Sequence, residues 1–131
     1  MLPRCTQDPE RALLSPVLEA VTDRASGLLL PDRLGDVLHM PAAQLARLAQ
    51  LRRRTLQRHP QSPMVQTRLG EVARIVAAAA DLLGETGRAV VWFRHQPLSA
   101  FDGRTAAELV TDGHADAVLA HLELLRDGSY V

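Results

Sequence analysis

The stretch that decides the fold is residues 86–131, TGRAVVWFRHQPLSAFDGRTAAELVTDGHADAVLAHLELLRDGSYV. It holds the chain's only tryptophan, Trp92, and the clearest helix boundaries in the sequence. The segment Thr105-Ala-Ala-Glu108 has the pattern of a capping box. In such a box the threonine hydroxyl accepts a hydrogen bond from the glutamate N–H, and the glutamate carboxylate accepts one from the threonine N–H. The pattern predicts a short helix over 106–111.

A second amphipathic helix is expected to follow, over about 114–126. Its apolar stripe would consist of Ala117, Val118, Leu122 and Leu125. Gly128 then occupies the position after a helix end where the backbone is often left-handed, a conformation that glycine adopts without strain. A helix that ends in this way can present the residues beyond it to a partner.

The rest of the chain predicts further helices and no strands, because it lacks any long alternating run of β-branched and aromatic residues. Hydrophobic residues make up 47% of the chain and aromatic residues only 3%, so the apolar content is mostly Ala, Leu and Val, which suits closely packed helices. We therefore predict an all-α fold. The additional helices are expected at about 16–25, 31–38, 41–49, 53–58, 65–83 and 87–95. The apolar stripe of the helix at 65–83 is expected to comprise Val65, Leu69, Val72, Ile75 or Val76, Ala79 and Leu82 or Leu83.

This pattern divides the chain into an N-terminal arm (1–27), a helix-turn-helix region (28–63), a long connecting helix (64–84) and a small helical C-terminal domain (85–131). The net charge is zero, and all fifteen basic residues are arginines.

The charges are unevenly distributed along the chain. Residues 1–38 hold four arginines and six acids, a net charge of −2. Residues 39–80 hold seven arginines and one acid, a net charge of +6, and residues 81–131 hold four arginines and eight acids, a net charge of −4. Such segregation indicates different surfaces for different partners.

Residues 41–60, PAAQLARLAQLRRRTLQRHP, have the layout of a helix-turn-helix. Ala46 is the small residue required where the two helices cross, and Leu51 and Leu56 would anchor the second helix. That helix would present side chains able to donate to DNA phosphates and base edges. These candidate DNA-binding residues are Arg52, Arg53, Arg54, Thr55, Gln57 and Arg58.

Two residues depart from the usual helix-turn-helix pattern. Gln50 stands at the turn position that favours glycine, and its backbone would be strained if its φ is positive. Arg52 stands at the N-cap of the second helix, where Ser or Thr is usual, and it cannot accept from the backbone. The alternative interpretation is that the unit only dimerises or acts as a scaffold, with the arginines as a solvated face.

No pattern in the sequence indicates an enzyme, a metal site or a bound cofactor. The five histidines show no i, i+4 pairing and no cysteine nearby, as a zinc site would need. The trio Asp112, His114 and Asp116 straddles an expected helix start, where acids stabilise the helix dipole. The sequence contains no glycine-rich phosphate loop and no nucleophile elbow.

We expect a cytoplasmic protein that does not enter the membrane. The single cysteine, Cys5, cannot form an intramolecular disulfide, so it does not indicate an oxidising compartment. No apolar run approaches the roughly 20 residues of a membrane-spanning helix. The first twenty residues lack the continuous apolar core of a signal peptide.

An ordered succession of short motifs in the C-terminal stretch resembles a known family. The motifs are Ala89-Val-Val-Trp92-Phe93-Arg94, Pro97-Leu98, Phe101-Asp-Gly103-Arg104-Thr105-Ala-Ala-Glu108-Leu109-Val110, then Gly113, Val118, Leu119, Leu122 and Gly128-Ser-Tyr130. Each motif is unspecific alone, but the series resembles the toxin-binding domain of the Xre/MbcA/ParS antitoxins. The similarity continues upstream and covers about 28–131.

The resemblance implies an antitoxin whose partner is a RES-domain toxin, a fold related to ADP-ribosyltransferases that consumes NAD or transfers from it. It implies that the C-terminal domain covers the toxin's active-site entrance, and that the helix-turn-helix represses the protein's own operon by binding operator DNA. We also expect an antitoxin homodimer. The expected toxin-binding residues are Arg104, Glu123, Arg126, Asp127, Gly128, Ser129, Tyr130 and Val131.

The chemistry of the tail is consistent with this role. Tyr130 offers a large apolar area with a polar group at low entropic cost. The acids Glu123 and Asp127 add negative charge, and a toxin pocket built for an anionic dinucleotide should be basic. Two alternatives stay open: a stand-alone transcription regulator whose C-terminal domain dimerises, and an enzyme that uses Asp112 and His114.

Overall fold

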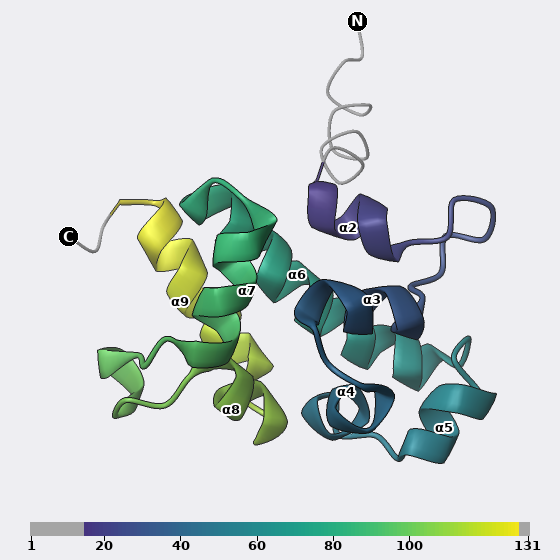
Figure 1. Ribbon diagram of the computed structural model, residues 1–131. Helices are drawn as coiled ribbons and strands as arrows, with labels where there is room; N and C mark the ends of the chain where they lie inside the picture. The colour runs from purple at the N-terminus through teal and green to yellow at the C-terminus, as the bar shows by residue number, and fades with distance from the viewer. Residues whose placement is uncertain (1–14, 129–131) are drawn as a thin grey trace, which may run out of the picture.

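The computed structural model describes residues 15–128. Predictions on residues 1–14 and on Ser129, Tyr130 and Val131 therefore lie outside the described residues. Within 15–128 the fold is all-α, as predicted, with one short 3-10 helix, η1 (Figure 1). The elements are α2 Pro16–Val21, α3 Pro31–Leu38, α4 Ala42–Leu48, α5 Arg53–Arg58, α6 Pro63–Leu83, α7 Thr86–His95, η1 Ser99–Phe101, α8 Ala106–Thr111 and α9 Ala115–Arg126.

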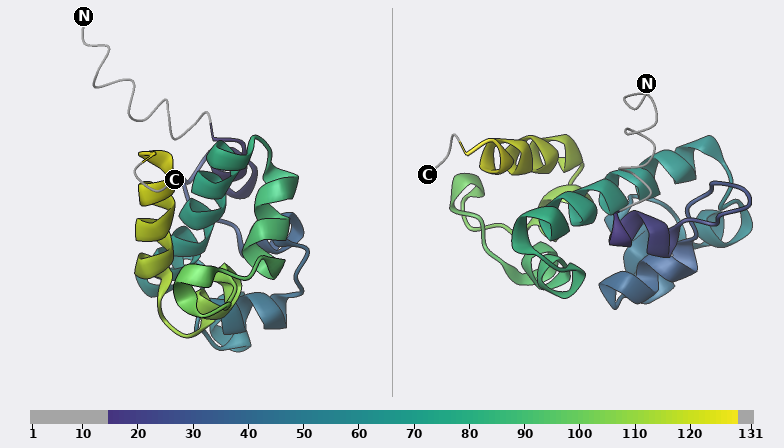
Figure 2. Two further views of the ribbon diagram at one scale, coloured as in Figure 1. Left: turned by 90° about the vertical axis from the view of Figure 1, so that its left-hand side faces the viewer. Right: turned by 90° about the horizontal axis from the view of Figure 1, so that it is seen from above.

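The long helix α6 is the element around which the others are arranged. Its first turn is capped by the Ser62 hydroxyl, which accepts from the Val65 N–H at 3.3 Å, and Gly84 ends it with a φ of 93°. Figures 1 and 2 show α3, α4 and α5 gathered near one end of α6 and α7, α8 and α9 near the other. One face of α6 contributes to the packing of both groups, so the two halves of the molecule share one core.

The described core consists of aliphatic side chains around one phenylalanine. Leu34 and Leu38 come from α3, Leu69 comes from α6 and Phe93 comes from α7, and none of these four is exposed. Burying such a side chain stabilises the fold by roughly 1.5–3 kcal/mol. No charged or polar residue among 15–128 is fully buried, so the core is held mainly by apolar contact.

The two helices predicted for the helix-turn-helix region are present as α4 and α5, joined by a short turn. Ala46 is 2% exposed at the crossing of α4 with its neighbours, and Leu56 of α5 is also buried. Gln50 has a φ of 59°, the left-handed conformation anticipated for this turn. Arg52 is the N-cap of α5 and makes no capping side-chain hydrogen bond, as its chemistry predicted.

Three details of the predicted helices are wrong. The helix expected over 16–25 ends at Val21, because Thr22 adopts an extended conformation and pairs with Leu29 in an antiparallel bridge. In the following loop, Asp23 accepts hydrogen bonds from the Ser26 hydroxyl and N–H, which lower the pKa of its carboxyl group.

The end of α6 also differs from the prediction that its apolar stripe continues to the last turn. Leu82 and Leu83 are 38% and 37% exposed, because the helix extends past the core that covers Ala79 and Ala80.

Helix α9 starts one residue later than expected, with His114 as its N-cap. Ala115 is buried, and Ala117, which was expected on the apolar stripe, is only half-buried.

Candidate functional site

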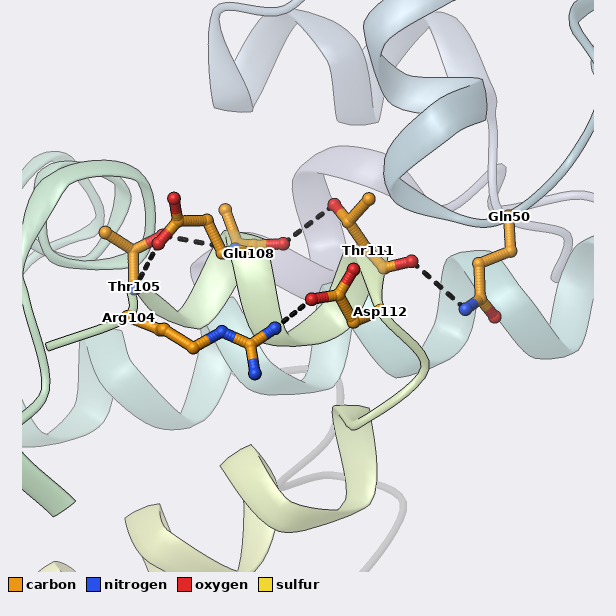
Figure 3. Close-up of polar contacts among 7 residues, drawn as sticks. Gln50, Arg104, Thr105, Glu108, Thr111 and Asp112 are labelled. Carbon is orange, nitrogen blue, oxygen red and sulfur yellow. Dashed lines mark hydrogen bonds and ion pairs between the residues drawn. The ribbon is translucent and has the colours of Figure 1, made fainter. Parts of the chain in front are cut away.

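Side-chain contacts hold helix α8 at both of its ends, and one of them, the capping box, was predicted from the sequence. The predicted capping box is present: the Glu108 N–H donates to the Thr105 hydroxyl at 3.1 Å, and the Thr105 N–H donates to the Glu108 carboxylate at 2.8 Å (Figure 3). Arg104, just before the helix, forms an ion pair with Asp112 at its C-cap. The short helix is therefore held in one orientation despite having only six residues.

Helix α9 packs its inward face on this unit and on α6. Val118 and Leu122 are buried, and the ring of His121 lies edge-on to Phe101 with centroids 5.6 Å apart. Because Phe101 belongs to η1, this contact joins the loop before α8 to the middle of α9.

The outer end of α9 brings together four of the predicted toxin-binding residues. Glu123, Arg126, Asp127 and Gly128 are all exposed there. Gly128 has a φ of 72°, the left-handed conformation predicted for the residue after the helix end. This end of α9 carries two acids and one base.

Arg104 lies elsewhere, on the surface that faces α4. It lines a cavity of about 530 Å³ together with Gln44 and Arg47 of α4 and Glu108 of α8. None of the residues from Glu123 to Gly128 lines this cavity. The predicted set is therefore divided between two surfaces, because Arg104 is directed along α8 toward Asp112 (Figure 3).

The candidate DNA-binding residues lie together on α5 and just before it. Arg52, Arg53, Arg54, Gln57 and Arg58 are exposed and Thr55 is half-buried, while Leu56 faces the core. The helix thus presents a basic outer face with four arginines and no acid between residues 52 and 58.

Gln50, at the turn between α4 and α5, also contacts the C-terminal half. Its side-chain amide donates to the Thr111 carbonyl oxygen at the end of α8, at 3.1 Å (Figure 3). The Arg68 guanidinium donates to the Ala49 carbonyl oxygen at 3.0 Å and to the Gln50 carbonyl and side-chain oxygens, both at 3.2 Å.

Arg94 makes an equivalent contact at the end of α3. It donates to the carbonyl oxygens of Leu38 and His39 at 3.1 and 3.0 Å. The sequence did not predict the contacts of Arg68 and Arg94, because neither arginine belongs to a motif that includes the residues it contacts.

The described residues give no geometric support to catalysis or metal binding. Of the suggested enzyme trio, Asp112 pairs with Arg104, and His114 occupies the N-cap position of α9 without a capping side-chain hydrogen bond. Within 15–128 no group of three or more His, Cys, Asp or Glu side chains could hold a metal ion. No helix in that range is long and apolar enough to cross a membrane.

Comparison with known families identifies the C-terminal unit. Residues 78–128 match the family described as the antitoxin Xre/MbcA/ParS C-terminal toxin-binding domain. Searches of curated proteins and of solved structures gave no significant match. The matched residues include the capped α8 and the packed α9. The match confirms the resemblance to the Xre/MbcA/ParS antitoxins for residues 78–128.

Proposed function

We propose that this antitoxin neutralises a RES-domain toxin, which consumes NAD or transfers from it, by covering the toxin's active-site entrance with the end of α9 and the residues after it. The observation that carries this proposal is the exposed acidic end of α9 inside the matched toxin-binding domain. Glu123 and Asp127 are exposed at this end, and Asp116 is exposed in the first turn of the same helix.

Charge supports the choice of this surface. A pocket that binds an anionic dinucleotide needs basic groups, and acids on a docking partner would complement them and speed association. Residues 81–131 carry a net charge of −4, in contrast to +6 for residues 39–80. The toxin should therefore approach the α9 end rather than the basic surface of α5.

The test is co-expression with the product of the neighbouring gene, followed by host growth and cellular NAD. Full-length antitoxin should restore both, whereas residues 1–127 should fail because Gly128 to Val131 are removed. The double variant Glu123→Arg/Asp127→Arg should lower toxin affinity roughly 10-fold or more, since like charges would face a basic pocket. Asp36→Arg, an exposed acid on α3, is the matched control and should bind normally. A neighbour that is harmless without this chain would overturn the proposal.

We infer a second function for the other half: α5 binds operator DNA and represses the antitoxin's own operon. Its support is the exposed basic face of α5 behind a left-handed turn at Gln50. Arg53→Ala/Arg54→Ala should weaken operator binding and flatten its dependence on salt, because fewer counterions are released. If DNA binding is steep in salt but no toxin partner exists, the protein is a stand-alone regulator instead.

A further inference from the structure

The cavity that Arg104 lines lies between the two halves of the molecule. Helix α4 forms one wall, and the end of α7 and the length of α8 form the other, with α4 and α8 in contact beside it (Figure 1). Its volume of about 530 Å³ falls within the range of roughly 300–1,000 Å³ that is typical of small-molecule sites. Neither the basic helix α5 nor the outer end of α9 lines it, so it is separate from the surfaces proposed above for DNA and toxin.

This cavity, which we call the α4–α8 cleft, combines an apolar floor with a cationic rim. Its floor includes Met40 and Leu48, which are only 7% and 3% exposed. Its rim carries Arg47 of α4, Arg94 of α7 and Arg104, the residue before the N-cap of α8. An organic anion could place an apolar group on the floor and its charge at the rim, whereas a bare inorganic anion would use the rim alone.

Two of the three guanidinium groups are already held in place by the fold. Nη1 of Arg94 donates to the carbonyl oxygens of Leu38 and His39 at 3.1 and 3.0 Å. Arg104 forms its ion pair with Asp112 through Nη2. Because a guanidinium has five N–H donors, each of these arginines keeps donors for a ligand. A ligand that binds such fixed groups immobilises fewer side chains and loses less conformational entropy.

The acids of the α4–α8 cleft do not cancel its positive charge. Asp112 pairs with Arg104, and the Glu108 carboxylate accepts from the Thr105 N–H at 2.8 Å. Three arginines and two acids leave the lining with a net charge of +1. The exposed side chain of Arg47 makes no hydrogen bond or ion pair within residues 15–128. Arg47 is therefore the cation that the fold leaves available for an anion.

We propose that the α4–α8 cleft binds a phosphate-bearing small molecule with a planar apolar group, of the size of a nucleotide. Guanidinium groups bind phosphate through paired N–H···O hydrogen bonds, which favours phosphate over other anions at a site with several arginines. Arg47 contacts the phosphate from α4, and Arg94 and Arg104 contact it from the opposite wall. The planar group packs on Met40 and Leu48. Such a ligand touches both halves of the molecule at once.

The test titrates the full-length protein with AMP, adenosine and inorganic phosphate, in the absence of toxin and DNA. Calorimetry gives the affinities, and the methyl signals of the chain's three methionines report where the ligand binds. We expect saturable binding of AMP with a dissociation constant below about 1 mM. Adenosine and inorganic phosphate should each bind roughly 10-fold more weakly or less, because each lacks one half of the contacts. The Met40 signal should shift, whereas that of Met64, 52% exposed on α6 outside the cleft, should not.

Arg47→Gln is the decisive variant, because the Arg47 side chain makes no polar contact that the fold would lose. It should weaken AMP binding roughly 10-fold or more. Arg74→Gln, at an exposed arginine of α6 outside the cleft, is the matched control and should bind AMP normally.

Three results would overturn the proposal. The first is an absence of AMP binding at millimolar concentration, or equal AMP affinities of Arg47→Gln and Arg74→Gln. The second is inorganic phosphate that binds as tightly as AMP, since the apolar floor would then play no part. The third is an Arg47→Gln protein that binds duplex DNA more weakly but AMP normally, which would assign Arg47 to a DNA surface. Because the titration contains no toxin, its outcome is independent of whether the protein neutralises one.

Discussion

The two halves of the molecule end their helices in different ways. In the N-terminal half, α3 and α4 are followed by His39 and Gln50, which adopt left-handed backbone conformations with φ of 57° and 59°. In the C-terminal half, helices α6, α8 and α9 are followed by Gly84, Gly113 and Gly128. A left-handed conformation costs a residue with a side chain about 1–2 kcal/mol and costs glycine almost nothing.

The strained ends in the N-terminal half are held by side chains from later helices. Arg94 of α7 binds the carbonyl oxygens at the end of α3, and Arg68 of α6 binds those at the end of α4. At the ends of α6, α8 and α9 a glycine adopts the left-handed conformation without strain, although Gln50 also donates to the Thr111 carbonyl oxygen at the end of α8. The turn between α4 and α5 therefore depends on distant residues, whereas the ends of α6 and α9 are marked by a nearby glycine.

The largest effect should follow from removing Arg68. Arg68→Ala deletes three charge-assisted contacts to the turn and should lower the free energy of unfolding by about 2 kcal/mol. Urea unfolding would measure the loss, and hydrogen exchange should show the α4–α5 turn opening more often. Arg74→Ala, an exposed arginine on the same helix, should change stability by less than about 0.5 kcal/mol. Equal effects of the two variants would mean that water replaces Arg68 at the turn.

A smaller and local effect is expected in the C-terminal half. Thr105→Ala removes the hydroxyl that accepts from Glu108 and should destabilise the protein by about 1 kcal/mol. Thr105→Ser keeps the cap and should retain most of the stability. Hydrogen exchange should increase at the start of α8 in the alanine variant but stay unchanged at the α4–α5 turn. Faster exchange at the α4–α5 turn in the alanine variant would show that the cap of α8 also stabilises the N-terminal half.

This contrast also explains which features could be predicted from the sequence. The capping box at Thr105 and the glycine after α9 depend on four residues or fewer, so the boundaries of α8 and the end of α9 followed from local patterns. The position of Arg104 did not, because its partner and the facing helix α4 are defined only by the packed fold. The exposure of Leu83 was missed for the same reason, since periodicity marks an apolar stripe but not where the core beneath it ends.

The smallest net effect is expected at Gln50, where the two halves meet. Glycine at this position removes the left-handed strain, worth about 1 kcal/mol, but also removes the hydrogen bonds with Thr111 and Arg68, worth roughly the same. Gln50→Gly should therefore leave the free energy of unfolding within about 0.5 kcal/mol of the wild-type value. Gln50→Ala keeps the strain and loses the same contacts, so it should be less stable than Gln50→Gly by about 1 kcal/mol.

Urea unfolding of both variants separates strain from contact. If Gln50→Ala is as stable as the wild-type protein, the side-chain bonds to α8 and α6 contribute nothing, and the turn is held by Arg68 acting on the backbone alone. If Gln50→Gly is clearly more stable than the wild-type protein, the backbone strain at Gln50 destabilises the fold by more than its side-chain hydrogen bonds stabilise it. Its presence would then be explained by the link that it makes between the α4–α5 turn and the end of α8, rather than by stability.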